Sequence, residues 1–308
     1  MEIRRYVVGV DGSVPSRAAI RWAVARARGG GTGVTLVHVA DDEWGSVGTL
    51  LIDEVDQDAR ARLDDDLGYA RSLAPEVGID GVVRSGSPMA ELASFSDAET
   101  MIVVGTHKTG FHYGRAFGSR SLQLANLAVG PVAVIPEVAS RMRKGVVVGV
   151  DDTAAGGVAV DLAADLACDH HCELTAVRST ESRVLGGADG GEPAELQSRR
   201  EDEARGILAA AVARARARQR DIVIRSRVVR RPAGAALNEL ARSAEVLVIG
   251  DSRRAAAQLG SLGAVAYDVL LNLSSPTIVV HAPAAEAGSD PGAAAEESPA
   301  EGETYVIG

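Results

Sequence analysis

The sequence has few cysteines, few aromatic residues and no long apolar run. Cys168 and Cys172 are its only two cysteines, which argues against a disulfide framework and is typical of a reducing compartment. Aromatic residues make up 3% of the chain, and an apolar content carried by Ala, Val and Leu favours helices packed on a sheet over a β-sandwich. No apolar stretch approaches the roughly 20 residues of a membrane-spanning helix.

The chain also lacks an excess of basic residues. Its net charge of -10 argues against non-specific attraction to nucleic acid or to anionic membranes. Residues 283–308 contain acidic residues but no Lys or Arg, among Ala, Gly, Ser and Pro, and this composition predicts a disordered acidic tail. The segment after Met1 leads into a strand-like run without the apolar core of a signal peptide. We therefore expect a cytoplasmic protein.

The sequence repeats itself. "VVGVDGS" at 7–13 returns 140 positions later as "VVGVDDT", and "IVVG" ending at Gly105 returns 145 positions later as "LVIG" ending at Gly250. A duplicated unit predicts two domains, 1–140 and 141–282, followed by the tail. The net five-residue insertion is placed in the glycine-rich segment 179–193, which is typical of a loop.

Short apolar runs alternate with helical patterns within each copy. Continuous apolar strands separated by helices predict a parallel sheet covered on both faces. The fold class is therefore α/β, with two tandem doubly wound five-stranded parallel-sheet domains, Rossmann-like in character. In the first copy the predicted strands are 6–10, 34–39, 81–84, 101–104 and 132–135, and the predicted helices cover 19–27, 53–73, 88–95 and 119–128.

A glycine-rich segment, "GTHKTGFHYGRAFGS" at 105–119, follows the fourth predicted strand. Glycines at a strand exit let backbone amides approach an anion, and a helix opening at Gly118-Ser119 offers free amides and a positive dipole end. Lys108 or Arg115 would neutralise charge. The segment thus suits a polyphosphate, although Gly118 as a turn residue and Ser119 as an N-cap explain the same pattern without a ligand.

A second candidate loop, Asp11-Gly12-Ser13, follows the first predicted strand. Asp11 could reach a ribose hydroxyl or an adenine amine, while Ser13, ahead of Pro15, is a plausible N-cap. Ligands bind doubly wound sheets beyond the carboxyl ends of the strands, where the winding reverses. If the first strand is central, both loops meet at one crevice.

These residues resemble the universal stress protein family. The stretch from Val8 to Ser16 resembles its first strand and turn, and its nucleotide motif is Gly, two residues, Gly, nine residues, then Gly-Ser or Gly-Thr. Gly105 fills the first place, Lys108 replaces the second Gly, and Gly118-Ser119 close the motif. The resemblance covers 3–136 and 145–281.

The resemblance implies a non-enzymatic, regulatory stress-response protein that binds ATP, or AMP or cyclic AMP, mainly in the first domain. It also implies a fold like the adenine nucleotide alpha hydrolases. A side chain at Lys108 either obstructs the phosphates or contacts them. By analogy the adenosine end is lined by Gly9, Asp11 and the backbone of Val39, and the phosphates by Gly105, Thr106, Lys108, Gly110, Gly118, Ser119 and Ser121.

The second copy departs further from the motif. Asp151 is kept, but Asp152-Thr153 replaces Gly-Ser, Arg253 takes the middle glycine position, and Gly263-Ala264 lacks the hydroxyl. We expect weaker binding in the second domain, or none.

Three alternatives stay open. "GTHKTGFH" is close to a P-loop but has Phe111-His112 where Lys-Ser/Thr is required, so a slow ATP hydrolase using His107 or His112 is one alternative. An interaction scaffold with vestigial sites is another. "CDHHC" at 168–172 offers metal ligands, but zinc sites draw on two separated pairs, so we expect no metal.

The expected partners are an adenine nucleotide and the other half of the chain, with a homodimer as a further option. The fifth strand of each unit is a sheet edge, and edges invite pairing. We therefore predict that Val132–Ile135 and Thr277–Val280 join the halves into a pseudo-dimer.

Overall fold

The computed structural model describes residues 1–40, 49–106, 110–112, 115–117, 119–137, 143–181, 194–251 and 262–282. The first half contains β1 (Arg5–Val10), α1 (Val14–Gly30), β2 (Gly33–Ala40), α2 (Thr49–Leu73), β3 (Ile79–Ser85), α3 (Pro88–Ala93), β4 (Thr100–Thr106), β5 (Gly110–His112), β6 (Arg115–Phe117), α4 (Ser119–Leu127) and β7 (Val132–Pro136). The second half contains β8 (Val146–Gly149), α5 (Ala154–Asp169), β9 (Leu174–Ser179), α6 (Ala194–Arg218), β10 (Ile224–Val229), α7 (Ala233–Ala241), β11 (Val246–Asp251), α8 (Ala264–Leu271) and β12 (Thr277–His281). The predicted tail and most of the predicted insertion lie outside these ranges.

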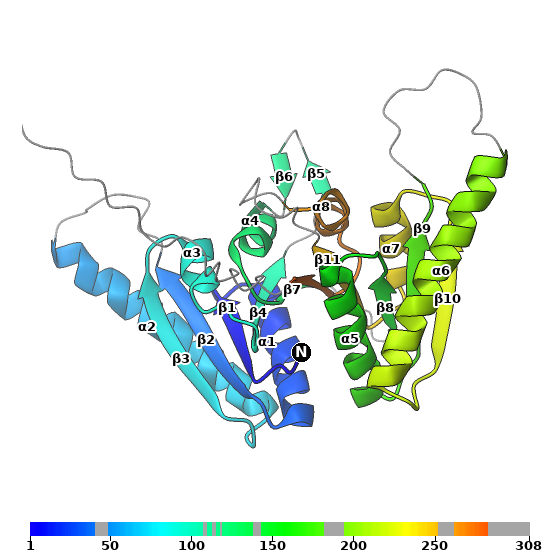
Figure 1. Cartoon of the computed structure of the whole chain (residues 1–308). Helices are drawn as coiled ribbons and strands as arrows, with labels where there is room; N and C mark the ends of the chain where they lie inside the picture. The colour runs from blue at the N-terminus through cyan, green and yellow to red at the C-terminus, as the bar shows by residue number, and fades with distance from the viewer. Residues whose placement is uncertain are drawn as a thin grey trace, which may run out of the picture.

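Ten strands form one continuous sheet in the order β10-β9-β8-β11-β12-β7-β4-β1-β2-β3. Within each half all neighbouring strands are parallel, and β1 and β8 are the central strands of their halves. This is the doubly wound arrangement that the alternating pattern predicts, because parallel strands need helical crossovers that cover both faces. Figure 1 shows the two halves side by side, with helices on both faces of the sheet.

The halves are joined through their fifth strands. β12 pairs antiparallel with β7, with Thr277 opposite Val134, Ile278 opposite Ala133 and Val279 opposite Val132. The predicted pairing of the two halves is therefore confirmed. The backbone hydrogen-bonding groups of the two edge strands, β7 and β12, pair with each other. Neither strand is therefore left as an unpaired sheet edge between the halves.

Two apolar layers cover the sheet, and each runs through both halves. One is built on the α1, α2, α5 and α6 side and contains Ile20, Leu36 and Leu174; the other lies under α3, α4, α7 and α8 and contains Ile102 and Leu247. Alternate residues of each strand face opposite layers. For example, Val8 belongs to the first layer and Val7 to the second.

The glycine-rich segment contains structure that the sequence interpretation missed. β5 and β6 pair as a short antiparallel hairpin, with Gly110 opposite Phe117 and His112 opposite Arg115. The sequence interpretation treated this segment as a glycine-rich phosphate-binding segment and predicted no strands in it. The physical reason for the hairpin is that Phe111 and Phe117 are strand formers, a signal outweighed in the sequence by the surrounding glycines.

None of the helices in the described ranges combines the length and the hydropathy needed to span a bilayer.

Candidate functional site

A cavity of about 290 Å³ lies at the carboxyl ends of β1 and β4 in the first half. Its walls come from the turn after β1, the end of β2, the short helix α3 and the first turn of α4. The volume is at the lower end of the roughly 300–1,000 Å³ typical of small-molecule sites. It lies where the order of the strands reverses around β1, the usual ligand position in doubly wound sheets.

The structure brings half of the expected site residues together. The cavity is lined by Gly9, Asp11, Val39, Gly105 and Ser121. Thr106 is buried at the end of β4 and is not among the lining residues. Gly110 belongs to β5 and Ser119 begins α4, while Lys108 and Gly118 lie outside the described residues.

The β1–α1 turn is fixed by its own polar groups. The amide of Ser13 donates to Asp11 Oδ1 at 3.0 Å, and Gly12 has a φ of 75°, a conformation that favours glycine. The amide of Ser16 donates to Ser13 Oγ at 3.3 Å. Ser13 is therefore the N-cap of α1, as expected, and Asp11 shapes the turn as well as lining the cavity.

Behind this turn lies a buried carboxylate that sequence reasoning missed. Asp66 on α2 is 1% exposed, and its Oδ1 lies 3.6 Å from Arg17 Nε. Burial raises the pKa of the Asp66 carboxyl, while Arg17 and the backbone amide of Gly12 oppose the rise. Asp66 thus supports the Asp11–Ser13 turn from the side opposite the solvent. Asp66 lies in the predicted helix 53–73, which is rich in charged residues, so the sequence did not indicate that this side chain would be buried.

A close approach of two backbones places the exit of β4 beside the start of α1. A Cβ added at Gly105 would lie 2.0 Å from the carbonyl oxygen of Pro15. The second half repeats the arrangement, since a Cβ at Gly250 would lie 2.6 Å from the carbonyl carbon of Ala155. Only glycine allows this contact. Gly105 is therefore required by packing, independently of any ligand.

Helix α3 and the first turn of α1 supply lining residues that were not predicted. Pro88, Met89 and Leu92 form an apolar wall; the i, i+3 spacing of Met89 and Leu92 after the third strand was the available signal. Ser16 also lines the cavity, is 4% exposed, and its Oγ has no hydrogen-bond partner among the described atoms. A buried hydroxyl without a partner is costly unless a ligand or water satisfies it.

The polar end of the cavity favours an anion. The first turns of α1 and α4 contain no acidic residue, so the positive dipole end of each helix faces the cavity without a carboxylate in its own first turn, although Asp11 lies just ahead of α1. Arg120, exposed in the first turn of α4, lines the same end. Val37, Val39 and Met89 provide an apolar part of the lining.

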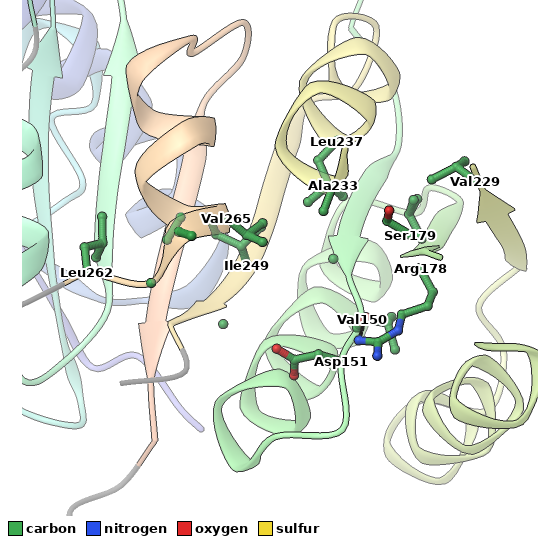
Figure 2. Close-up of a pocket in the computed structure, with 16 residues that line it drawn as sticks. Val150, Asp151, Arg178, Ser179, Val229, Ala233, Leu237, Ile249, Leu262 and Val265 are labelled. Atoms are coloured by element: carbon green, nitrogen blue, oxygen red, sulfur yellow. Dashed lines mark hydrogen bonds between the residues drawn. The ribbon is translucent and has the colours of Figure 1, made fainter. Parts of the chain in front are cut away.

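The second half has a larger cavity, of about 480 Å³, at the equivalent place (Figure 2). Val150, Leu237, Ile249 and Val265 are among its apolar lining residues, with Asp151, Arg178 and Ser179 as polar ones. A guanidinium nitrogen of Arg178 donates to the carbonyl of Val150 at 3.2 Å. Loss of the motif residues has therefore not closed this cavity, although weaker nucleotide binding there stays a prediction.

The end of β11 differs in chemistry from the end of β4. Asp251, 145 positions after Thr106, is 1% exposed, and its Oδ1 accepts a hydrogen bond of 2.8 Å from the amide of Gly263. Its Oδ2 lies 3.4 Å from Nδ1 of the buried His281 at the end of β12. A carboxylate thus occupies a position where the first half has a threonine.

The "CDHHC" segment connects α5 to β9. It therefore lies at the amino-terminal ends of the strands, whereas the two cavities lie at the carboxyl ends. His170 and His171 form the turn after α5, with His171 at a φ of 49°, and His170 Nδ1 lies 3.1 Å from Glu245 Oε1. Both cysteines are free and half-buried. Burial, with the nearby Glu245, raises the pKa of the Cys172 thiol. Within the described residues, no group of three or more His, Cys, Asp or Glu has metal-site geometry. His107 lies outside those residues.

The fold is that of a tandem doubly wound α/β protein with a cavity at the carboxyl ends of the strands in each half. The chain belongs to the universal stress protein family, whose model matches residues 2–136 and 142–281. A universal stress protein of Mycobacterium tuberculosis is 30% identical over 308 aligned positions, covering 90% of this chain and 95% of the relative. One from Mycolicibacterium smegmatis is 28% identical, covering 89% and 96%.

A crystal structure supports the fold. A universal stress protein from Archaeoglobus fulgidus superposes with a TM-score of 0.64 at 15% identity, covering 90% of this chain and 96% of that one. At this identity the similarity concerns the fold alone.

Proposed function

We propose that the first half binds an adenine nucleotide, ATP or its relatives AMP and cyclic AMP. The observation that carries the proposal is the hydroxyl of Ser16, which is buried in the wall of the first cavity without a partner among the described atoms. A polar ligand in the cavity would satisfy it.

The cavity has the two chemical ends that a nucleotide requires. Val37, Val39 and Met89 suit the base, while Asp11 at the tip of β1 is placed for the ribose hydroxyls. The polar end, with Arg120 and the starts of α1 and α4, suits the phosphates. This division agrees with the roles that the family resemblance implies for the residues of the first strand and the closing helix.

The proposed role is regulatory and non-enzymatic, in a cytoplasmic stress response. A ligand that binds only the folded chain stabilises it by about 2.7 kcal/mol at 100 times its Kd. Occupancy would order the surface around the cavity and change what a partner protein contacts. The proposal includes no nucleic-acid or membrane partner.

Isothermal titration of ATP into the full chain tests the proposal. Ser16→Ala should weaken binding roughly 2- to 12-fold, the net value of one hydrogen bond. Ser275→Ala is the matched control, because Ser275 is fully buried in the second half and its Oγ also lacks a partner among the described atoms. The control should bind ATP like the unmodified chain. Mass spectrometry of nucleotide released on denaturation identifies the natural ligand.

Two outcomes would replace the proposal. No released nucleotide and no thermal shift with millimolar ATP would leave the scaffold alternative. Steady phosphate release from ATP that His107→Ala abolishes would establish the hydrolase alternative.

A further inference from the structure

The buried carboxylate of Asp251 lies beside the second cavity, next to lining residues but not itself part of the lining. Gly250, Gly263 and Ala264 line that cavity, and Asp251 directly follows Gly250 in β11. Gly263 holds the place in the second copy that Gly118 holds in the first. Its amide is thus one that the repeated motif would direct at an anion, and it donates to Asp251 Oδ1 at 2.8 Å.

The other charges around this cavity do not favour a phosphate. Asp151 lines it and already accepts from the amide and the hydroxyl of Thr153, at 3.1 and 2.6 Å. Among the described residues that line the cavity, Arg178 is the cation, and it donates to the carbonyl of Val150. A phosphate here would meet the carboxylate of Asp151 in the lining, with the buried carboxylate of Asp251, 3.4 Å from His281, beside that lining. Like charges repel more strongly where water is excluded.

Apart from Ser179, the other described side chains of the lining are apolar, and the cavity is roomy. Val177, Val229, Ala233 and Leu237 add to the apolar surface of a cavity of about 480 Å³. Figure 2 shows Ala233 and Leu237 on one side of the cavity and Ile249 and Val265 on another, with Asp151 near the carboxyl end of β8. Such a cavity can take a flat organic body without an anionic group.

We propose that Asp251 takes the place of a ligand phosphate and makes the second cavity a site for an uncharged nucleoside that excludes nucleotides. Asp251 is then the residue that sets ligand specificity between the two halves. The proposal rests on the proposed function, since it treats the glycine amide ahead of the closing helix as part of a phosphate site.

Titration of adenosine and AMP into the full chain, followed through the amide resonances of Gly263 and its neighbours, is the first test. Adenosine should shift these resonances with a Kd at least 10-fold lower than that of AMP. Equal affinities, or no response to adenosine, would overturn the proposal without any variant.

Asp251→Thr, which copies Thr106, is the second test. The variant should bind AMP in the second half at least 10-fold more tightly than the unmodified chain, with adenosine affinity changed less than 3-fold. Asp251→Asn keeps the size of the side chain and an oxygen acceptor for Gly263, and should also gain AMP affinity if charge is the cause. Folded variants with no gain in AMP binding would refute the assignment.

Counting bound AMP per chain separates this inference from the proposed function. If both hold, the count rises from one to two on Asp251→Thr. A rise from zero to one means that the first-half proposal fails while this one stands, and a count that stays at one means the reverse.

Discussion

Gly105→Ala tests the packing that brings the two candidate loops together. The added Cβ would lie 2.0 Å from the carbonyl oxygen of Pro15 and 2.7 Å from the amide nitrogen of Ser16. An ordinary carbon–oxygen contact is about 3.3 Å, so the start of α1 and the end of β4 must separate by roughly 1.3 Å. The obstacles are backbone atoms and cannot rotate away.

Two opposing effects set the size of the change. Replacing glycine by alanine stabilises a compatible site by about 0.4–1 kcal/mol, because the unfolded chain has less freedom to lose. Overpacking costs about 1–3 kcal/mol, and more where the backbone must move. The contact distance decides the sign, so we expect a net loss of about 2 kcal/mol or more. Because both halves are expected to unfold as one unit of roughly 280 residues, that corresponds to a fall in Tm of about 3–4 °C.

Thermal unfolding followed by circular dichroism, with matched variants, measures this effect. Gly250→Ala should lower Tm less, because its nearest contact is 2.6 Å. Gly68→Ala, within α2 and with nothing inside 4 Å of the added Cβ, should raise the free energy of unfolding by about 0.5–1 kcal/mol. A Gly105→Ala chain that melts within 1 °C of the unmodified protein would refute the close approach, and with it the shared crevice.

Three further predictions concern titration and cooperativity. Burial raises the pKa of Asp66 in the folded state, so its stabilising contribution is complete below the unfolded pKa of roughly 3.9 and declines as pH rises through the folded value. Asp66→Asn should therefore gain stability relative to the unmodified chain as the pH rises above about 4 in urea titrations, and a constant difference would contradict this. The raised pKa of Cys172 predicts slow alkylation by iodoacetamide at pH 7 that accelerates above pH 9, with Cys172→Ser as the control; rapid labelling at pH 7 would be inconsistent with its burial. Calorimetry should show one unfolding transition for both halves, because β7 and β12 pair and both apolar layers cross that junction; two separated transitions would show that the halves unfold independently.

Local sequence features were enough to predict the architecture and the position of the first cavity. The repeat, the apolar runs and the pairing of the fifth strands depend on patterns that recur along the chain and on general rules for parallel sheets. The same rules placed Asp11 and Gly105 at one crevice, and Gly9, Val39 and Ser121 line it too. Most of these residues lie at or just after the ends of strands, and the order of the strands in the sheet is enough to bring those ends together.

The sequence did not predict the roles of residues whose neighbours in space are far away along the chain. The hydroxyl of Ser16, which has no partner among the described atoms, and the burial of Asp66 behind the first turn depend on where α1 and α2 pack. The sequence likewise showed substitutions in the second copy but not that Asp251 would bind the amide of Gly263, 12 positions along the chain.

What the sequence alone determined is the duplicated α/β fold and the edge of the sheet where a ligand is expected, because periodicity and repeats are readable one segment at a time. What only the tertiary structure decided is the chemical character of each cavity. Burial, dielectric environment and hydrogen-bond partners belong to a side chain's neighbours in space, and neither Thr106 nor Asp251 reveals them by its identity.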